Sequence, residues 1–213
     1  LNKPESLAKM ARDALLDSIL SGHLKLDEVY NEMALAKDLG ISRTPVREAL
    51  LELSVQGLVR FIPRKGVVIN RFTETDVAEI FELRKALESA IVERVARNDP
   101  PVDLAAIERT LTDQRTAFEK RDYRAFLDAD RAFHIEFCRL TQNRRMQAIL
   151  ENLRNMIHLM GTQALQLEGR GETVLAEHEV IIEAVRQKDP EAARNAMLRH
   201  LENSESAVLE GRK

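Results

Sequence analysis

The sequence has a single cysteine, Cys138, among its 213 residues. One cysteine cannot form a disulfide within the chain, so a disulfide framework is excluded and a reducing compartment is favoured. The sequence also lacks an apolar run long enough to span a membrane, and it lacks a charged-then-apolar signal segment at its start. These absences predict a cytoplasmic protein that does not bind a membrane. The length is sufficient for one large domain or two small ones.

The chain as a whole has little excess charge of either sign, since its formal net charge is −3. Such a balance is unusual for a protein that binds the negative backbone of DNA. Residues 1–72, however, carry 11 lysines and arginines against 9 acidic residues (net +2), whereas residues 73–213 carry 21 against 26 (net −5). Within residues 41–71, six basic side chains accompany only two acidic ones. Basic charge is therefore concentrated in one segment, as expected of a nucleic-acid-binding surface.

Residues 36–58 have the pattern of a helix-turn-helix. Gly40 can adopt the positive φ that a tight turn between helices needs. Ser42 is a suitable N-cap, and Pro45 falls in the first helical turn, where its missing N–H costs little. Apolar residues at helical spacing then predict a core-facing stripe, made of Val46, Ala49, Leu50, Leu53 and Leu58.

The start of this second helix carries three candidate DNA contacts, Arg43, Thr44 and Arg47. The first residues of a recognition helix reach base edges in the major groove, where a guanidinium can bind guanine O6 and N7 together. Two short β-rich runs follow around residues 63–66 and predict a hairpin, or wing. Its tip carries Arg64 and Lys65, which can meet phosphates or a minor groove. The alternative is an ordinary hairpin with a solvated basic tip.

The order of these features resembles the winged helix of GntR-family bacterial transcription regulators. The resemblance spans about residues 6–70 and rests on E-x-x-L-A-x-x-L-G-I-S-R-T-P-V-R-E-A-L from Glu32, then Gly57-Leu58-Val59 and Pro63-x-x-Gly66. It implies that Arg43, Thr44 and Arg47 read the major groove, and that Lys65 and Gly66 approach the minor groove. Residues 24–30 depart from the family pattern because they lack the proline often found between the first two helices.

A capping-box pattern from Thr73 to Asp76 predicts a new helix and a domain boundary near residue 72. Only helical signals follow, and they predict six helices at about 73–98, 103–120, 122–140, 143–167, 172–188 and from 189 onward. Asp99-Pro100-Pro101 should end the first of these helices, and Gly169 with Gly171 the fourth. We therefore expect a mainly α protein with a winged helix-turn-helix at 1–72 and an all-α antiparallel bundle at 73–213.

One carboxylate and three imidazoles interrupt the apolar stripes of the expected bundle: Asp130, His134, His178 and His200. Asp130 and His134 are four residues apart, so they share one helix face, among phenylalanines. A buried, unpaired aspartate is costly, and convergence of these four side chains would suit a divalent transition metal. Each of the four alone is more often a hydrogen-bonded core residue, and the sequence does not show that their helices meet.

The same residues resemble the motif segments of the FCD domain, the helical effector domain of FadR-subgroup GntR regulators. The matching segments are Asp130-x-x-Phe133-His134, Glu177-His178 and His200-Leu201. The resemblance implies one divalent metal per chain, zinc or nickel and alternatively manganese, beside a cavity for a small carboxylic acid. Six effector helices rather than seven make the chain more similar to the VanR-type branch.

Arg84 matches an arginine common in the first helix of FCD domains and could hold an effector carboxylate through two hydrogen bonds. The alternative is an exposed or interface salt bridge with Glu88, four residues on.

The sequence thus predicts a ligand-responsive DNA-binding regulator rather than an enzyme, with repression released or retuned by a carboxylate. Two-fold symmetry would double the short site that one helix can read, so we expect a homodimer on a pseudo-palindromic DNA operator. Two alternatives stay open: a metal-dependent hydrolytic enzyme, with Glu177 or Glu179 as its base, and a metal-free dimerisation module.

Overall fold

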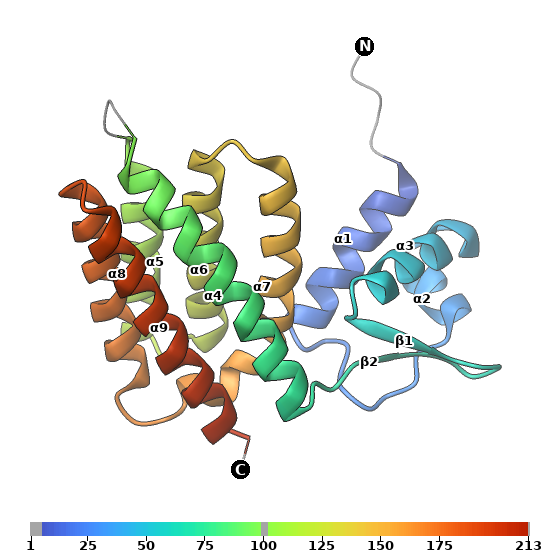
Figure 1. Cartoon of the computed structure of the whole chain (residues 1–213). Coiled ribbons are helices and arrows are strands. Elements are labelled where there is room, and N and C mark those ends of the chain that lie inside the picture. The colour runs from blue at the N-terminus through green and yellow to red at the C-terminus, as the bar shows by residue number, and fades with distance from the viewer. Residues whose placement is uncertain (1–5, 99–101, 213) are drawn as a thin grey trace. The chain divides into compact units, whose positions relative to one another are not determined.

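The computed structural model describes residues 6–98 and 102–212, and the chain divides into two compact units, Leu1–Arg71 and Phe72–Lys213. The described residues form helices and one two-stranded antiparallel sheet (Figure 1). This arrangement confirms the mainly α fold class. None of the helices in the described ranges is long and apolar enough to cross a membrane.

The first unit has the order of a winged helix: α1 (Leu7–Leu20), α2 (Glu32–Asp38), α3 (Arg43–Val55), β1 (Val59–Ile62) and β2 (Gly66–Ile69). Gly40, in the turn between α2 and α3, has a φ of 68°, as the sequence predicts. Ser42 is the N-cap of α3, although its side chain makes no capping hydrogen bond. The predicted apolar stripe is the core of this unit, because all five of its residues are at most 1% exposed.

The wing is held on both sides of β2. On one side β1 pairs antiparallel with β2, with Phe61 opposite Val67. On the other side the Tyr30 N–H donates to the Val67 carbonyl (2.8 Å), and the Val67 N–H donates to the Tyr30 carbonyl (2.9 Å). Gly66 has a φ of 140°, and a Cβ there would lie well under 3.0 Å from the Tyr30 carbonyl oxygen. Glycine is therefore required where the wing meets the chain before α2.

The second unit is a bundle whose helices are α4 (Glu74–Ala96), α5 (Ala105–Glu119), α6 (Tyr123–Leu140), α7 (Arg144–Leu165), α8 (Arg170–Arg186) and α9 (Pro190–Glu210). The predicted capping box is present, since Thr73 Oγ1 accepts from the Asp76 N–H while Asp76 accepts from the Thr73 N–H. The predicted helix stop at residues 99–101 lies outside the described residues.

One helix boundary differs from the prediction. Gly169, with a φ of 73°, precedes α8, whereas Gly171 lies inside the helix and does not break it. A Cβ at Gly171 would lie well under 3.0 Å from the Phe118 ring. Glycine is therefore needed at this position because α8 approaches Phe118 of α5 closely, and not because the chain turns here.

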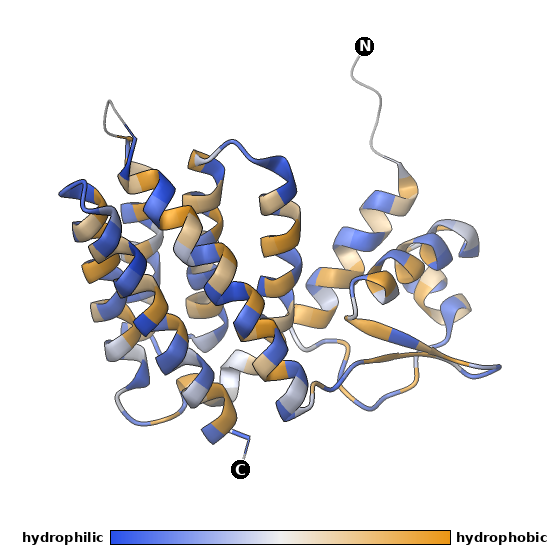
Figure 2. Cartoon of the chain, in the orientation of Figure 1, coloured by the Kyte–Doolittle hydropathy of each residue, from blue (hydrophilic) through white to orange (hydrophobic). Residues whose placement is uncertain are grey.

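The bundle interior is mainly apolar and contains several buried polar side chains. Figure 2 shows apolar and polar stripes alternating around the helices. Pairs of helices pack along one another, α4 with α9, α5 with α6 and α8 with α9. Phe81, Phe133, Phe137, Ile181 and Leu201 are at most 1% exposed. The buried polar side chains of the bundle include the four candidate metal ligands.

Candidate functional site

The structure brings the four candidate ligands together in the bundle. Asp130 and His134 come from α6, His178 from α8 and His200 from α9, and all four are buried. Each offers one nitrogen or oxygen atom, and these four atoms lie within 4.8 Å of one another. Asp130 Oδ1 lies 3.9 Å from His134 Nε2 and 3.7 Å from His178 Nε2. The convergence that the sequence left open is thus present.

Each of the three imidazole rings has a side-chain oxygen of another helix near Nδ1, and for His178 and His200 this oxygen is a hydrogen-bond acceptor. His200 Nδ1 lies 2.7 Å from Glu177 Oε2, and His178 Nδ1 lies 2.9 Å from Gln114 Oε1. His134 Nδ1 contacts Glu88 Oε2. An acceptor at Nδ1 favours the proton on that nitrogen and leaves the Nε2 lone pair free.

The Nε2 atoms lie on the other side of the imidazole rings and are free to bind a ligand. Nε2 of His134 and Nε2 of His178 are buried and have no hydrogen-bond partner among the described residues, and Nδ1 of His134 touches Glu88 without forming a hydrogen bond. Buried polar atoms are rarely left without a partner, so these two Nε2 atoms are suited to bind an ion.

Protonation states also suit a metal site, because a metal ligand must be deprotonated. Burial lowers the pKa of His134 from 6.5 to about 4, and burial lowers the pKa of His178 well below 6.5. Burial by itself would raise the pKa of Asp130, but Arg154 and the neighbouring imidazoles outweigh it and hold that pKa below its usual range. At neutral pH the cluster therefore presents neutral imidazoles at 134 and 178 and an ionised carboxylate.

The distances from Asp130 to two of the histidines are those of ligands around one ion. A divalent metal about 2.0–2.2 Å from nitrogen and oxygen ligands holds two neighbouring ligands roughly 3–4 Å apart. The separations of 3.7 and 3.9 Å from Asp130 Oδ1 lie in that range. Three imidazoles and one carboxylate are ligands that zinc, nickel and manganese all accept. These residues therefore fit the metal that the sequence implies.

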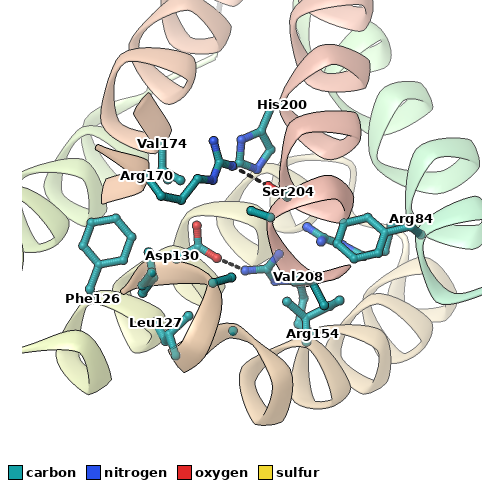
Figure 3. Close-up of a pocket in the computed structure, with 16 residues that line it drawn as sticks. Arg84, Phe126, Leu127, Asp130, Arg154, Arg170, Val174, His200, Ser204 and Val208 are labelled. Atoms are coloured by element: carbon teal, nitrogen blue, oxygen red, sulfur yellow. Dashed lines mark hydrogen bonds and ion pairs between the residues drawn. The ribbon is translucent and has the colours of Figure 1, made fainter. Parts of the chain in front are cut away.

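A cavity of about 40 Å³ adjoins the cluster, lined by side chains of α4, α6, α7, α8 and α9 (Figure 3). This volume is the room of about three water molecules. Its polar lining residues are Arg84, Asp130, Arg154, Arg170, His200 and Ser204, and the other lining residues are apolar or glycine. The cavity therefore has a charged side next to the cluster and an apolar remainder.

Arg84 has features of both roles considered from the sequence, an effector-binding residue and a salt-bridge partner of Glu88. Its Nε donates to Glu88 Oε1 at 2.7 Å, so the i,i+4 ion pair exists, but both side chains are buried rather than exposed. Arg84 also lines the cavity, and its Nη1 and Nη2 have no hydrogen-bond partner among the described residues. Burial lowers the pKa of Arg84 from 12.5 to about 10, which leaves it cationic at neutral pH. It is therefore a buried cation with two donors unused.

Two further arginines at the cavity were not anticipated. Arg154, on α7, is bonded to Asp130 and so supplies the compensation that a buried aspartate needs (Figure 3). Arg170, at the start of α8, donates to Glu177 (3.0 Å) and to Ser204 Oγ (2.8 Å). The position of Arg154 one turn after Leu150 on an apolar face was the available signal. It is easily missed, because an arginine in a helix is usually solvent-exposed.

The candidate DNA-contacting residues lie in the first unit, and all of them except Thr44 line one groove. Arg43, Thr44 and Arg47 are exposed at the start of α3, and Arg64 and Lys65 are exposed at the wing tip. A groove of about 420 Å³ is lined from both of these elements, including Gly66.

Glu32 lies beneath this groove and was not singled out from the sequence as a site residue. It is buried, and Oε2 accepts from Arg43 Nε and Oε1 from Arg47 Nη1, each at 2.7 Å. One carboxylate therefore holds both candidate readout arginines.

Each of the two units matches a known protein family. The family described as bacterial regulatory proteins, gntR family, matches residues 7–69, and the FCD domain family matches residues 79–203. The HTH-type transcriptional regulator YdhC of Bacillus subtilis is 32% identical over 201 residues, which cover 94% of this chain and 90% of that protein. The gluconate operon transcriptional repressor of the same species is 28% identical, covering 80% of this chain and 72% of the repressor.

A solved structure shows the same fold. Escherichia coli McbR/YncC superposes with a TM-score of 0.86 at 22% identity, covering 98% of this chain and all of that one. Together with the two family matches, this places the chain by sequence as well as by fold. The chain belongs to the GntR family of bacterial regulatory proteins, carries an FCD domain as its second unit, and is a DNA-binding transcription regulator.

Proposed function

We propose that this regulator senses a small carboxylate at a divalent transition metal held by Asp130, His134, His178 and His200. The metal is zinc or nickel, alternatively manganese, with one ion per chain. The observation that carries the proposal is the hydrogen bonding of His178 and His200 at Nδ1 to acceptors from other helices, with Glu88 in contact with Nδ1 of His134. Such outer contacts are typical of metal-binding histidines, since they set the tautomer and the direction of Nε2.

The protein's own groups would bind the rest of the effector. The metal, when bound, supplies a Lewis-acid position for one carboxylate oxygen. Arg84 offers Nη1 and Nη2, whose geometry matches two carboxylate oxygens. Arg154 holds Asp130 in place.

The DNA-contacting roles follow from exposure and position in the winged helix. Arg43, Thr44 and Arg47 read base edges in the major groove, while Arg64, Lys65 and the backbone at Gly66 approach the minor groove or phosphates. The protein acts in the cytoplasm as a homodimer on a short pseudo-palindromic operator. Repression is supported by the gluconate operon repressor among its relatives. Effector binding would change the relative placement of the two DNA-binding units in the dimer, and hence operator affinity.

The enzyme alternative has little support in the structure. Glu177, which could act as a base, is engaged by Arg170, His200 and Asn203. Glu179 pairs with Arg115 at the surface. The relatives are named as transcription regulators.

Metal analysis of matched variants tests the sensor. After dialysis with zinc, nickel or manganese, mass spectrometry should find one ion per wild-type chain and less than a tenth of that in His178→Ala. His158→Gln is the control, because His158 is another buried histidine of the bundle but lies outside the ligand cluster. His178→Ala should still bind DNA, without an effector response. Wild-type protein that retains no stoichiometric metal would refute the proposal.

A further inference from the structure

From the charges around this cavity we infer that the effector is a dianion, namely a short dicarboxylate rather than a monocarboxylate. The inference rests on the proposed function and adds the charge and number of the anionic groups. It depends on which side chains are paired and which donors remain unused.

Without a metal, the buried charges at the cavity cancel. Three arginines are each paired with one carboxylate: Arg84 with Glu88 at 2.7 Å, Arg154 with Asp130, and Arg170 with Glu177 at 3.0 Å. All six side chains are at most 11% exposed. The protein alone is therefore close to neutral at this place.

A divalent metal changes that balance by two positive charges. Its histidine ligands bind as neutral imidazoles, so they do not reduce the charge. An uncompensated charge is costly in a buried site. A monocarboxylate would leave one positive charge uncompensated, whereas a dianion removes both.

The unused donors indicate where a second carboxylate would bind. Arg84 Nη1 and Nη2 and Arg154 Nε are buried without a partner among the described residues, and both arginines line the cavity. In Figure 3 these two arginines come from different helices and reach the same space. One carboxylate can therefore bind the metal beside Asp130 and His200, and the other can accept from Arg84.

The remaining lining sets the size and nature of the carbon skeleton. Phe126, Leu127, Val174 and Val208 present apolar surface around the arginines (Figure 3). The cavity of about 40 Å³ is small. This small volume favours a short carbon skeleton over a long one.

Calorimetric titration of zinc-loaded protein with matched acids tests the inference. Malonate and succinate are each compared with their own monomethyl ester, which keeps the skeleton and removes one charge. We expect a diacid to bind at least about thirtyfold more tightly than its ester, with the zinc content unchanged after titration. In Arg84→Lys, which keeps the charge and removes the fork, the affinity for the diacid should fall at least about tenfold.

The outcomes separate this inference from the proposed function. Equal affinity for a diacid and its ester would overturn the dianion while leaving carboxylate sensing intact. Tight binding of inorganic phosphate with weak binding of both diacids would replace the dicarboxylate with a phosphate group. Binding of none of these anions to zinc-loaded protein would refute the proposed carboxylate sensing itself.

Independently, the geometry points to Glu32 as a positioning residue for base readout. Its side chain is 8% exposed, while the two arginines bound to it are 57% and 53% exposed. The carboxylate thus lies behind the guanidinium groups and leaves them accessible to DNA. Holding both in advance reduces the side-chain freedom that would otherwise be lost on binding.

Removing the charge of Glu32 should affect specific and non-specific binding differently. In Glu32→Gln the readout arginines lose their charged anchor, so affinity for the preferred duplex should fall about tenfold. Affinity for a scrambled duplex should stay the same or rise, because a negative charge near the phosphates is lost. Glu48→Gln is the control, since Glu48 is an exposed acidic residue of α3 and undergoes the same change of charge.

Fluorescence anisotropy at fixed salt measures both affinities. The preferred duplex is selected by the wild-type protein from a random DNA pool, and the scrambled duplex has the same composition. Glu32→Asp, which keeps the carboxylate, should recover part of the discrimination. If Glu32→Gln and Glu48→Gln shift the two duplexes by the same factor, Glu32 acts only through its charge and the positioning role is refuted.

Discussion

Alanine at position 66 should detach the wing from the chain that precedes α2. Gly66 has a φ of 140°, and its Cα faces the Tyr30 carbonyl so closely that a Cβ would lie well under 3.0 Å from that oxygen. Tyr30 and Val67 exchange two backbone hydrogen bonds next to this point. Backbone atoms cannot turn aside as a flexible side chain can, so the wing or residue 30 must shift.

The magnitude follows from two contributions. A non-glycine residue in an unfavourable backbone region costs about 1–3 kcal/mol. Loss of the two hydrogen bonds costs about 1 kcal/mol each. Gly66→Ala should therefore destabilise the first unit by roughly 3–5 kcal/mol. Gly40→Ala is the control, because Gly40 has a φ of 68° but nothing within 4 Å of its Cβ position. It should cost only about 1–2 kcal/mol.

Urea unfolding gives the two free energies, and hydrogen exchange locates the change. The amides of Tyr30 and Val67 should lose protection in Gly66→Ala and keep it in Gly40→Ala. Equal destabilisation by the two substitutions would refute the argument from the close approach. So would full protection of the Tyr30 amide in Gly66→Ala.

Three further predictions concern the α4 cap, base readout and assembly. Thr73→Ala should destabilise the bundle by about 1 kcal/mol in thermal unfolding at neutral pH. Hydrogen bonds from the backbone and side chain of Thr73 lower the pKa of Asp76, so this capping contribution is present above pH 3.8 and is lost as the pH falls below it. Arg47→Ala should weaken specific DNA binding by about 1–3 kcal/mol, whereas Lys65→Ala should weaken binding to all sequences and reduce its salt dependence in gel-shift titrations. Sedimentation at micromolar concentration should show a dimer, and a monomer that still binds one half-site tightly would contradict this.

The elements predictable from sequence are those specified by neighbouring residues. The turn at Gly40, the capping box at Thr73 and the apolar stripe of α3 each depend on a few consecutive positions, and the structure has all three. The break expected at Gly171 was wrong because that glycine serves contact with Phe118, a distant residue. Local composition cannot distinguish a glycine in a turn from one at a close helix contact.

The candidate site was predictable only in part, for a related reason. Helical spacing showed that Asp130, His134, His178 and His200 lie on apolar faces. It could not show which residues stand behind them, because these come from other helices. Gln114, which accepts from His178, is 64 residues away in sequence. Pairing of Arg154 with Asp130 likewise depends on how α6 and α7 pack, and spacing within one helix gives no angle between two.

The apolar strand of the wing does not lie at an open sheet edge. β2 has the sequence Gly-Val-Val-Ile and lies between β1 and Tyr30, so Val67 uses its N–H and C=O on the Tyr30 side. An open edge with apolar residues can pair with a strand of another molecule and start aggregation. The outer strand is instead β1, which carries the exposed Arg60. When no DNA is bound, the wing should therefore resist edge-to-edge association between molecules of this protein.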